Sequence, residues 1–250
     1  MQKEAKKCAR LIKESKFIVA LTGAGISTNA GIPDFRGPKG IYTTRKYDPD
    51  KTFDINYFLK DAKPFYDFAR DFIKTLAKVK PTFTHYFLAQ LQKRNKIQGI
   101  ITQNIDALHQ RAGSKKVIEL HGSFWRSYCL QCGREFSYQE MEKKIFKEDI
   151  PKCICGGIIK PDIVFFGEPV MHLNEAKKLA YQSDLFFVIG SSLVVYPAAM
   201  IPNLVNGKII IVNRGEADIF SQKVDLFCNE NVDDFFKKVS KFLNFPNTNI

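Results

Sequence analysis

Short polar motifs carry the residue types that could do chemistry in this 250-residue chain. They are TGAGIST at Thr22 to Thr28, GIPDFRG at Gly31 to Gly37, TQNID at Thr102 to Asp106, ELHG at Glu119 to Gly122 and GSS at Gly190 to Ser192. The motifs supply a glycine turn, an acid with an arginine, an amide beside an acid, and one histidine. With a cluster of four cysteines, they are the parts of an enzyme that consumes a cofactor.

The glycine turn directly follows an apolar run that ends at Thr22. Glycine at Gly23 and Gly25 would let the backbone turn tightly and approach a pyrophosphate. The third glycine of the usual G-x-G-x-x-G pattern is replaced by Thr28, and no clear acid follows about 20 residues on. We expect Asn213 to hold an adenosine ribose instead. A plain strand-to-helix turn is the alternative interpretation.

The loop containing Asp34, Phe35 and Arg36 is flanked by glycine and proline. It could form a lid, with Arg36 near phosphates and Phe35 covering a reactive carbon and excluding water. The alternative is a loop salt bridge beside one buried ring.

Polar side chains also follow the apolar run that ends at Thr102. At the carboxyl end of a parallel strand, Gln103, Asn104 and Asp106 would point into the crevice where α/β proteins bind ligands. They could orient hydroxyls, a water or a carboxamide. Alternatively, Asn104 or Asp106 caps the next helix.

His121 has the best setting for a general base among the four histidines, because it ends an apolar run and precedes a glycine. His109 lies in a helical pattern and is expected to pack or cap. His85 opens an apolar helical pattern and is expected to be structural. His172 is expected to be exposed.

Four of the six cysteines form two close pairs, Cys129 with Cys132 and Cys153 with Cys155. Glycines follow each pair, as in the tight turns of zinc knuckles. Four thiolates satisfy a tetrahedral Zn²⁺ and leave no position for substrate, so the metal would be structural. Disulfides are the alternative. The charged first residues precede no apolar core, so we expect a cytoplasmic, reducing location that favours zinc. Cys8 and Cys228 are expected to be buried packing residues.

Continuous apolar runs are typical of strands that are covered on both faces of a parallel sheet. The runs span residues 17–22, 97–102, 117–120, 185–190, 208–213 and 224–228. Helical patterns lie between several of them, which predicts a doubly wound α/β, Rossmann-like sheet. We expect a main domain of residues 1–36, 81–124 and 158–250. A helical insertion (37–80) and a cysteine module (125–157) would form a smaller lobe.

The net charge of +12 indicates either a solvated basic surface or attraction to polyanions. A nucleic-acid-binding module is therefore kept as an alternative, although the cysteine segment lacks interleaved arginines and aromatic residues. No apolar run approaches the roughly 18 residues of a membrane span, so no membrane partner is expected.

In their order and extent, these motifs resemble those of the sirtuin family of NAD-dependent protein lysine deacylases, of the bacterial and archaeal type. The matching segments also include IVFFGE at Ile163 to Glu168, GSSLVVYPA at Gly190 to Ala198 and VNRG at Val212 to Gly215. The resemblance covers nearly the whole chain. It implies that NAD is a consumed co-substrate bound by the main domain, that one structural Zn²⁺ is held by the four cysteines, and that acetylated-lysine proteins or peptides are the partners of a monomer.

The resemblance also implies a set of site residues. Those expected to contact NAD are Gly23, Ala24, Gly25, Thr28, Asp34, Phe35, Arg36, Gln103, Asn104, Ile105, Asp106, His121, Gly190, Ser191, Ser192, Asn213, Arg214, Asn231 and Val232. Those expected to contact the peptide are Val164, Phe166, Gly167 and Val194.

The mechanism implied by the resemblance begins when the acyl oxygen attacks the ribose as nicotinamide leaves. His121 then takes a proton from a ribose hydroxyl, and Asn104 orients that hydroxyl or a water. The products would be free lysine, nicotinamide and O-acetyl-ADP-ribose. Mono-ADP-ribosyl transfer to protein uses the same cleavage of nicotinamide and is kept as an alternative.

The acyl preference follows from a helical segment of the insertion. Family members that prefer acidic acyl groups carry a Y-x-x-R pair, whereas this chain has Tyr66 and Ala69, with Arg70 one position further on. One residue along a helix is a turn of about 100°, so Arg70 should point elsewhere. We expect neutral acyl groups, acetyl foremost.

Overall fold

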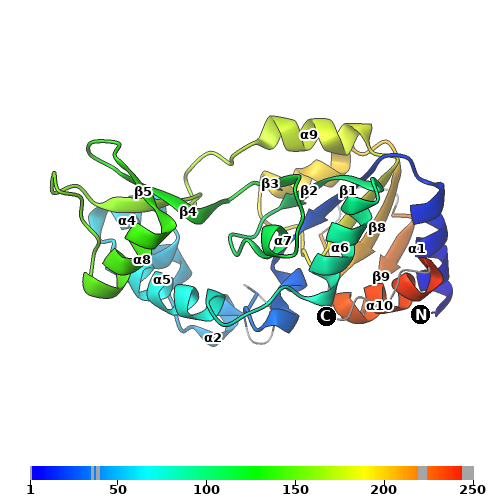
Figure 1. The fold of residues 1–250 in the computed structure, drawn as a ribbon, viewed down its shortest axis with the longest axis horizontal. Coiled ribbons are helices and arrows are strands. Elements are labelled where there is room, and N and C mark those ends of the chain that lie inside the picture. Colours follow the sequence, from blue (N-terminus) through cyan, green and yellow to red (C-terminus); the bar gives the residue numbers. More distant parts are fainter. Residues whose placement is uncertain (1, 35–36, 38–39, 219–223, 244–250) are drawn as a thin grey trace. The chain divides into compact units, whose positions relative to one another are not determined.

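The computed structural model describes residues 2–34, 37, 40–218 and 224–243 (Figure 1). Its backbone forms two compact units built from interleaved segments. The larger unit comprises Met1–Ala30, Lys80–Leu120 and His172–Ile250, and the smaller comprises Gly31–Val79 and His121–Met171.

Within the described residues, the larger unit contains a six-stranded parallel sheet with the strand order β3-β2-β1-β7-β8-β9. The strands are β1 (Ile18–Thr22), β2 (Ile97–Thr102), β3 (Val117–Glu119), β7 (Leu185–Ile189), β8 (Lys208–Val212) and β9 (Leu226–Cys228). Every residue of β1 and β7 is buried, which explains their continuous apolar character. The strand order reverses between β1 and β7, where doubly wound sheets open a crevice for ligands.

Helices cover both faces of this sheet. They are α1 (Gln2–Glu14), α6 (Phe83–Lys93), α7 (Leu108–Arg111), α9 (Leu173–Gln182) and α10 (Val232–Leu243), with the short 3₁₀ helices η1 (Ala24–Ile26), η2 (Thr28–Ala30) and η3 (Ala198–Leu204). Helices α1, α6 and α10 share one hydrophobic core with the strands, which includes Ile12, Phe87 and Phe236. Helix α9 lies on the other face, where its Leu179 approaches Gly99 of β2. The predicted doubly wound α/β fold is confirmed (Figure 1).

The smaller unit combines an antiparallel sheet with short helices. The strands are β4 (Gly122–Cys129), β5 (Glu135–Ser137) and β6 (Ile159–Ile163), in the order β5-β4-β6. The helices are α2 (Ile41–Thr44), α3 (Pro49–Thr52), α4 (Ile55–Lys60), α5 (Lys63–Leu76) and α8 (Tyr138–Lys147). Aromatic rings fill its interior: Phe165 lies 4.9 Å from Phe65 and 5.2 Å from Phe58, centroid to centroid.

The compact units divide the chain differently from the boundaries expected from sequence. Residues 31–36, 121–124 and 158–171 belong to the smaller unit, although the sequence placed them with the main sheet. The physical reason is that β6 pairs antiparallel with β4, so the segment after the cysteines completes the small sheet.

Among the described residues, no helix combines the length and apolarity that a membrane span requires.

Candidate active site

The glycine turn after β1 packs directly against the loop after β7. The Gly23 N–H donates to the Ile189 carbonyl at 3.0 Å, and the Gly25 N–H donates to the Gly190 carbonyl at 2.8 Å. A Cβ atom on Gly25 would lie 2.7 Å from Gly190 Cα, and Gly190 has a φ of +60°. Glycine is therefore required for the close approach of two backbones where the strand order reverses. This packing gives the glycines a structural purpose in addition to the expected approach to a pyrophosphate.

The loop after β2 is tied to the same turn by side chains. Asn104, which is 9% exposed, donates from Nδ2 to the Gly23 carbonyl at 3.1 Å and to Ser27 Oγ at 3.3 Å. Ser27 Oγ in turn donates to Asp106 Oδ2 at 2.6 Å, and the Leu108 N–H donates to Asp106 Oδ1 at 2.9 Å. The structure thus brings together Asn104, Asp106 and the glycine turn, as expected.

Asp106 is a buried carboxyl with an internal structural role. Burial raises its pKa, and the hydrogen bonds from Ser27 and from the Leu108 N–H oppose that rise. Both carboxylate oxygens already accept hydrogen bonds, so Asp106 orients the loop and the start of α7. Ser27 was not predicted as a site residue, although it lies within the GAGIST motif.

A further hydrogen bond links the ends of β2 and β7. Gln103 donates from Nε2 to Ser191 Oγ at 2.9 Å, and its N–H donates to the Thr22 carbonyl at 2.9 Å. Ser191 Oγ also accepts from the Leu193 N–H at 3.3 Å. Gln103, Ser191 and the glycine turn, predicted from separate motifs, therefore lie together at the carboxyl edge of the sheet. Ala24, Thr28, Ile105 and Ser192 of the adjoining loops are half-buried there.

Residues after β8 and before α10 shape a second part of this edge. Asn213 is 8% exposed and donates from Nδ2 to the Glu216 carbonyl at 3.0 Å, closing a turn that leaves Arg214 exposed. Asn231 caps α10 by accepting from the Asp233 N–H at 3.0 Å, and it exchanges hydrogen bonds with the side chain of Asn29. The amide of Asn231 is therefore committed to capping, and its neighbour Val232 is buried.

The GIPDFRG loop belongs to the smaller unit. Asp34 accepts a hydrogen bond from the Gly37 N–H at 2.9 Å, which closes a turn. Phe35 and Arg36 lie outside the described residues, so the lid expected from them stays a prediction.

His121 is half-buried and directly precedes β4. Its carbonyl accepts from the Val164 N–H at 3.0 Å, so the ELHG and IVFFGE segments run side by side in the smaller unit. Phe166 of the second segment exposes 49% of its surface, and Gly167 has a φ of +93°. Val194, in the larger unit, is half-buried.

The other histidines are as expected. His85 and His109 are buried side by side with ring centroids 4.7 Å apart. Burial lowers the pKa of His85 to about 3, and burial together with the charge of His85 lowers the pKa of His109 well below its ordinary value. Their roles are structural, since His85 bonds to Thr82 and His109 to Thr22. His172 is exposed.

The four cysteines of the smaller unit converge on one point. The Sγ atoms of Cys129, Cys132, Cys153 and Cys155 all lie within 4.8 Å of one another. Two of the separations are 3.4 Å (Cys129 to Cys155) and 3.7 Å (Cys132 to Cys153), too long for disulfides. Tetrahedral Zn²⁺ with bonds of about 2.3 Å places neighbouring sulfurs about 3.8 Å apart, so the cluster fits a structural zinc.

The turns around the cysteines also suit a metal. Gly133 and Gly156 have φ values of +72° and +88°, and a Cβ on Gly157 would lie 2.7 Å from Cys129 Sγ. Burial acts to raise the pKa of Cys129, but hydrogen bonds from the Cys132 and Gln131 N–H groups and from the neighbouring thiols outweigh it and bring that pKa to about 6. A hydrogen bond from the Gly157 N–H acts to lower the pKa of Cys155, but the neighbouring thiols raise it. A thiolate is thus favoured at Cys129, and a bound zinc would favour the thiolate form of the other cysteines. Cys8 and Cys228 are buried and not in disulfides, as expected.

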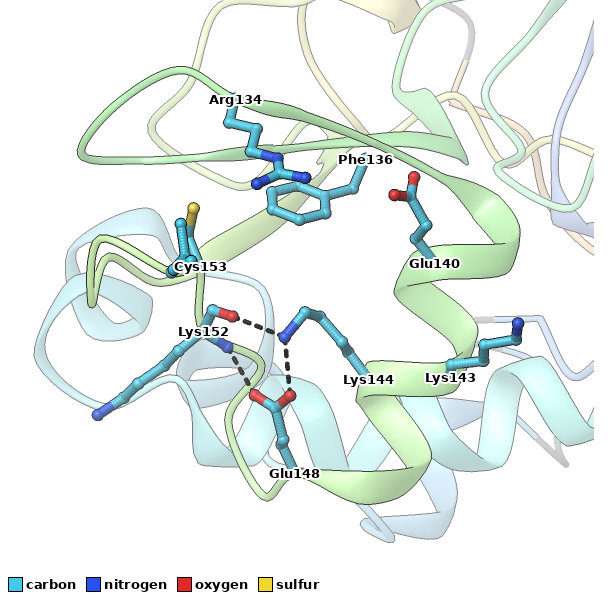
Figure 2. A pocket seen from close by; sticks show the side chains of 9 residues that line it. Arg134, Phe136, Glu140, Lys143, Lys144, Glu148, Lys152 and Cys153 are labelled. Atoms are coloured by element: carbon cyan, nitrogen blue, oxygen red, sulfur yellow. Dashed lines mark hydrogen bonds and ion pairs between the residues drawn. The ribbon is translucent and has the colours of Figure 1, made fainter.

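A surface hollow of about 500 Å³ lies beside Cys153 in the smaller unit (Figure 2). Two of the charged side chains that line it, Lys144 and Glu148, form an ion pair. Lys144 donates to Glu148 and to the Lys152 carbonyl, both at 2.8 Å, and Arg134 lies over the ring of Phe136. Apart from Cys153, no predicted site residue is among those that line it, so this hollow is not the candidate site.

Tyr66 and Arg70 of α5 are both engaged inside the smaller unit. The Tyr66 hydroxyl donates to the Ile159 carbonyl, and the side chain is fully buried. Arg70 donates to the carbonyls of Ile145, Glu148 and Asp149 at 3.1 to 3.2 Å, and pairs with Asp67 at 2.6 Å. These contacts hold the end of α8 against α5.

A doubly wound parallel sheet, a glycine turn where its strand order reverses and a tetrathiolate module define a nucleotide-binding enzyme with a structural metal. The chain belongs to the Sir2 family, because the model of that family matches residues 23–197. The resemblance inferred from the motifs is therefore confirmed.

Among curated proteins, the chain is similar to the NAD-dependent protein deacetylase of Sulfolobus acidocaldarius, with 47% identity over 239 residues and 94% of each chain covered. It is also similar to the NAD-dependent protein deacetylase of Thermotoga maritima, with 47% identity over 235 residues, covering 92% of this chain and 94% of that protein.

Among solved structures, the chain is similar to Sir2 with a deacetylated p53 peptide and 3′-O-acetyl ADP ribose, at a TM-score of 0.89 and 45% identity, covering 95% of this chain and 98% of that one. It is also similar to Sir2 with a p53 peptide and NAD⁺, at a TM-score of 0.86 and 44% identity, covering 94% and 97%.

Proposed function

We propose that this chain is an NAD-dependent protein deacetylase, which transfers the acetyl group of acetyl-lysine to ADP-ribose with release of nicotinamide and O-acetyl-ADP-ribose. The observation that carries this conclusion is the similarity to deacetylases over more than nine-tenths of both chains. Relatives solved with NAD⁺, with peptide and with 3′-O-acetyl ADP ribose represent substrates and a product of this reaction.

NAD is assigned to the carboxyl edge of the parallel sheet. The loops after β1, β2 and β7 are bonded to one another there, through Asn104 to Gly23 and through Gln103 to Ser191. A ligand that touches one loop therefore meets all three in fixed positions, which reduces the entropy lost on binding. The adenosine half is assigned to the edge formed by Asn213 and the start of α10. The amide of Asn231 serves there by shaping the loop, because it is bonded to Asn29.

His121 is assigned as the general base. Bound NAD supplies a ribose carbon activated by its nicotinamide leaving group. His121 takes a proton from a ribose hydroxyl, since histidine is the side chain most often used as a general base. Asn104 is assigned to orient that hydroxyl or a water, from a side chain anchored on its Nδ2 side. The cysteine cluster takes no chemical part, because four thiolates leave zinc no open position.

The acyl-lysine peptide is assigned to the segment Val164 to Gly167 in the smaller unit, and to Val194 in the larger. The N–H of Phe166 donates to the Phe53 carbonyl at 2.8 Å, and its carbonyl accepts from the Ile55 N–H at 3.1 Å. The backbone of Phe166 is thus already paired, so its half-exposed ring makes the contact with peptide. Neutral acyl groups are preferred, since Tyr66 is fully buried and Arg70 is bonded to three carbonyls.

We place the enzyme in the cytoplasm as a monomer, with acetylated proteins as its partners. By its motifs, we assign residues 1–36, 81–124 and 158–250 to the NAD-binding domain, and residues 37–80 and 125–157 to the helical and zinc-binding parts of the small domain. This assignment follows the motifs rather than the packing, because residues 121–124 and 158–171 pack in the smaller compact unit.

The test is a deacetylation assay with and without NAD, on the wild type and on His121→Ala. We expect activity only with NAD, and a fall in kcat of about 10²- to 10⁴-fold in the variant with NAD binding retained. His172→Ala, at an exposed histidine, is the matched control and should be fully active. Undiminished activity of His121→Ala would defeat the assignment of the base.

A further inference from the structure

Lys160 is a lysine buried inside the smaller unit. It lies on β6 with 1% of its side chain exposed. Lysine is almost never fully buried unless its charge is paired. Its Nζ donates to the Ile163 carbonyl at 2.6 Å and pairs with Glu168 Oε2 at 2.9 Å. Burial lowers the pKa of Lys160, and the hydrogen bond and charge of Glu168 oppose that shift.

The contacts of Lys160 converge on the short segment that follows β6. Glu168 Oε2 accepts from the Phe165 N–H at 2.8 Å as well as from Lys160, and the Glu168 N–H returns a hydrogen bond to the Phe165 carbonyl at 3.0 Å. Lys160 Nζ also lies 4.3 Å from the centroid of the Phe165 ring. One ammonium group therefore holds the start and the end of a turn that spans residues 165–168.

This turn presents two residues assigned above to the peptide. Phe165, the ring above Lys160, is 2% exposed, whereas the next ring, Phe166, is 49% exposed. Gly167 follows with a φ of +93°, and a Cβ there would lie 2.9 Å from Ile55 Cγ2. The turn thus directs one aromatic ring into the core and the next one outward, with little freedom for the backbone between them.

An apolar residue in place of a buried ion pair often stabilises a protein equally well, so stability alone is a weak reason for a buried lysine. We propose that Lys160 is a positioning residue for the acyl-lysine peptide, because its ammonium group fixes the Phe165–Glu168 turn that presents Phe166 and Gly167. This inference rests on the proposed function of the Val164 to Gly167 segment. The structure places Lys160 beneath that turn, so it acts on the substrate only through the turn.

The test compares Lys160→Met with wild type in steady-state kinetics and in direct binding of a fluorescent acetyl-lysine peptide. We expect KM and Kd for the peptide to rise about tenfold or more, with kcat and KM for NAD within about twofold, because the turn binds peptide and not NAD. The effect should be smaller on a capped single acetyl-lysine, which has no neighbouring residues to meet the turn.

Lys144→Met is the matched control, because Lys144 forms an ion pair with Glu148 at 2.8 Å in the same unit but not on this turn. It should leave KM for the peptide unchanged. If Lys160→Met does not fold, Glu168→Gln replaces it, since that change breaks the ion pair while Ile163 still accepts from Lys160. A rise in KM for the peptide is again expected, but a smaller one, because the glutamine oxygen can still accept from Lys160.

Two results would overturn the inference. A lower melting temperature in Lys160→Met and Glu168→Gln with an unchanged KM for the peptide would give Lys160 a purely structural role. A wild-type protein that binds no acetyl-lysine peptide would overturn the inference together with the proposed function, and the wild-type measurement distinguishes the two cases.

Discussion

Asn104 Nδ2 lies 3.1 Å from the carbonyl oxygen of Gly23, so the side chain that follows β2 is anchored on the glycine turn that follows β1. The same amide reaches Ser27 Oγ, and Ser27 continues to the buried carboxylate of Asp106. The loops after β1 and β2 at the candidate NAD site are therefore joined by one hydrogen-bond network.

Removing the Ser27 hydroxyl should break this hydrogen-bond network and destabilise the protein. Ser27→Ala takes away the 2.6 Å donor of a buried carboxylate, and we expect the free energy of unfolding to fall by about 1–3 kcal/mol in urea titrations. The control is Thr28→Ala, whose half-buried hydroxyl donates to the Gly25 carbonyl and touches no carboxylate in the described structure. An equal fall in the free energy of unfolding in the two variants would contradict a special role for Ser27.

Stability should fall in acid because of the paired histidines. Both have folded-state pKa values below the ordinary 6.5, so below pH 6.5 the unfolded chain binds protons that the folded chain does not. For His85, the free energy of unfolding should therefore fall as pH drops from 6.5 towards 3, by roughly 1.4 kcal/mol per pH unit.

The measurement is urea denaturation at a series of pH values in wild type and His85→Gln. Glutamine does not titrate, so the variant should show a shallower slope between pH 6.5 and 4 even though it is less stable at pH 7. Parallel slopes in the two proteins would contradict the assignment of this acid sensitivity to His85.

Removal of zinc should unfold the smaller unit, because the metal is structural and not catalytic. We expect elemental analysis to find one Zn²⁺ per chain. A strong chelator should reduce the far-UV circular dichroism signal and the activity together. Cys132→Ser should lower zinc content and melting temperature in the same way. An active, folded and metal-free enzyme would show that the cysteines need no metal.

Acyl preference should follow from the contacts of Tyr66 and Arg70. We expect acetyl-lysine peptide to be used faster than succinyl-lysine peptide, because neither side chain can turn towards a carboxylate without losing its internal hydrogen bonds. Competition between the two peptides in one reaction, followed by mass spectrometry, gives the ratio of kcat/KM directly. Faster use of the succinyl peptide would show this expectation to be wrong.

The sheet and the cysteine cluster could be predicted from sequence because each depends on a local pattern. Strands β1 and β7 are buried on both faces, so their apolar runs are continuous, and the two cysteine pairs with following glycines carry the knuckle geometry within a few residues. The side-by-side arrangement of the motif residues Gly23, Asn104 and Ser191 followed from the rule that parallel strands end at one edge.

Other features depend on contacts that no local pattern records. The segment of β6 reads IKPDI, in which a proline and two charged residues do not indicate a strand, yet it forms the edge of the small sheet, where proline is tolerated. Lys160 is buried with Glu168 as its ion-pair partner, and His85 is buried beside His109. These pairings required the folded chain to be seen.

The most direct test of the central claim is the balance of products from acetyl-lysine peptide and NAD labelled in the adenine. We predict one nicotinamide and one labelled O-acetyl-ADP-ribose for each lysine freed, and no freed lysine without NAD. Acetate released without consumption of NAD would contradict the account. So would label attached to protein while the acetyl group stays on lysine, because that result is ADP-ribosyl transfer.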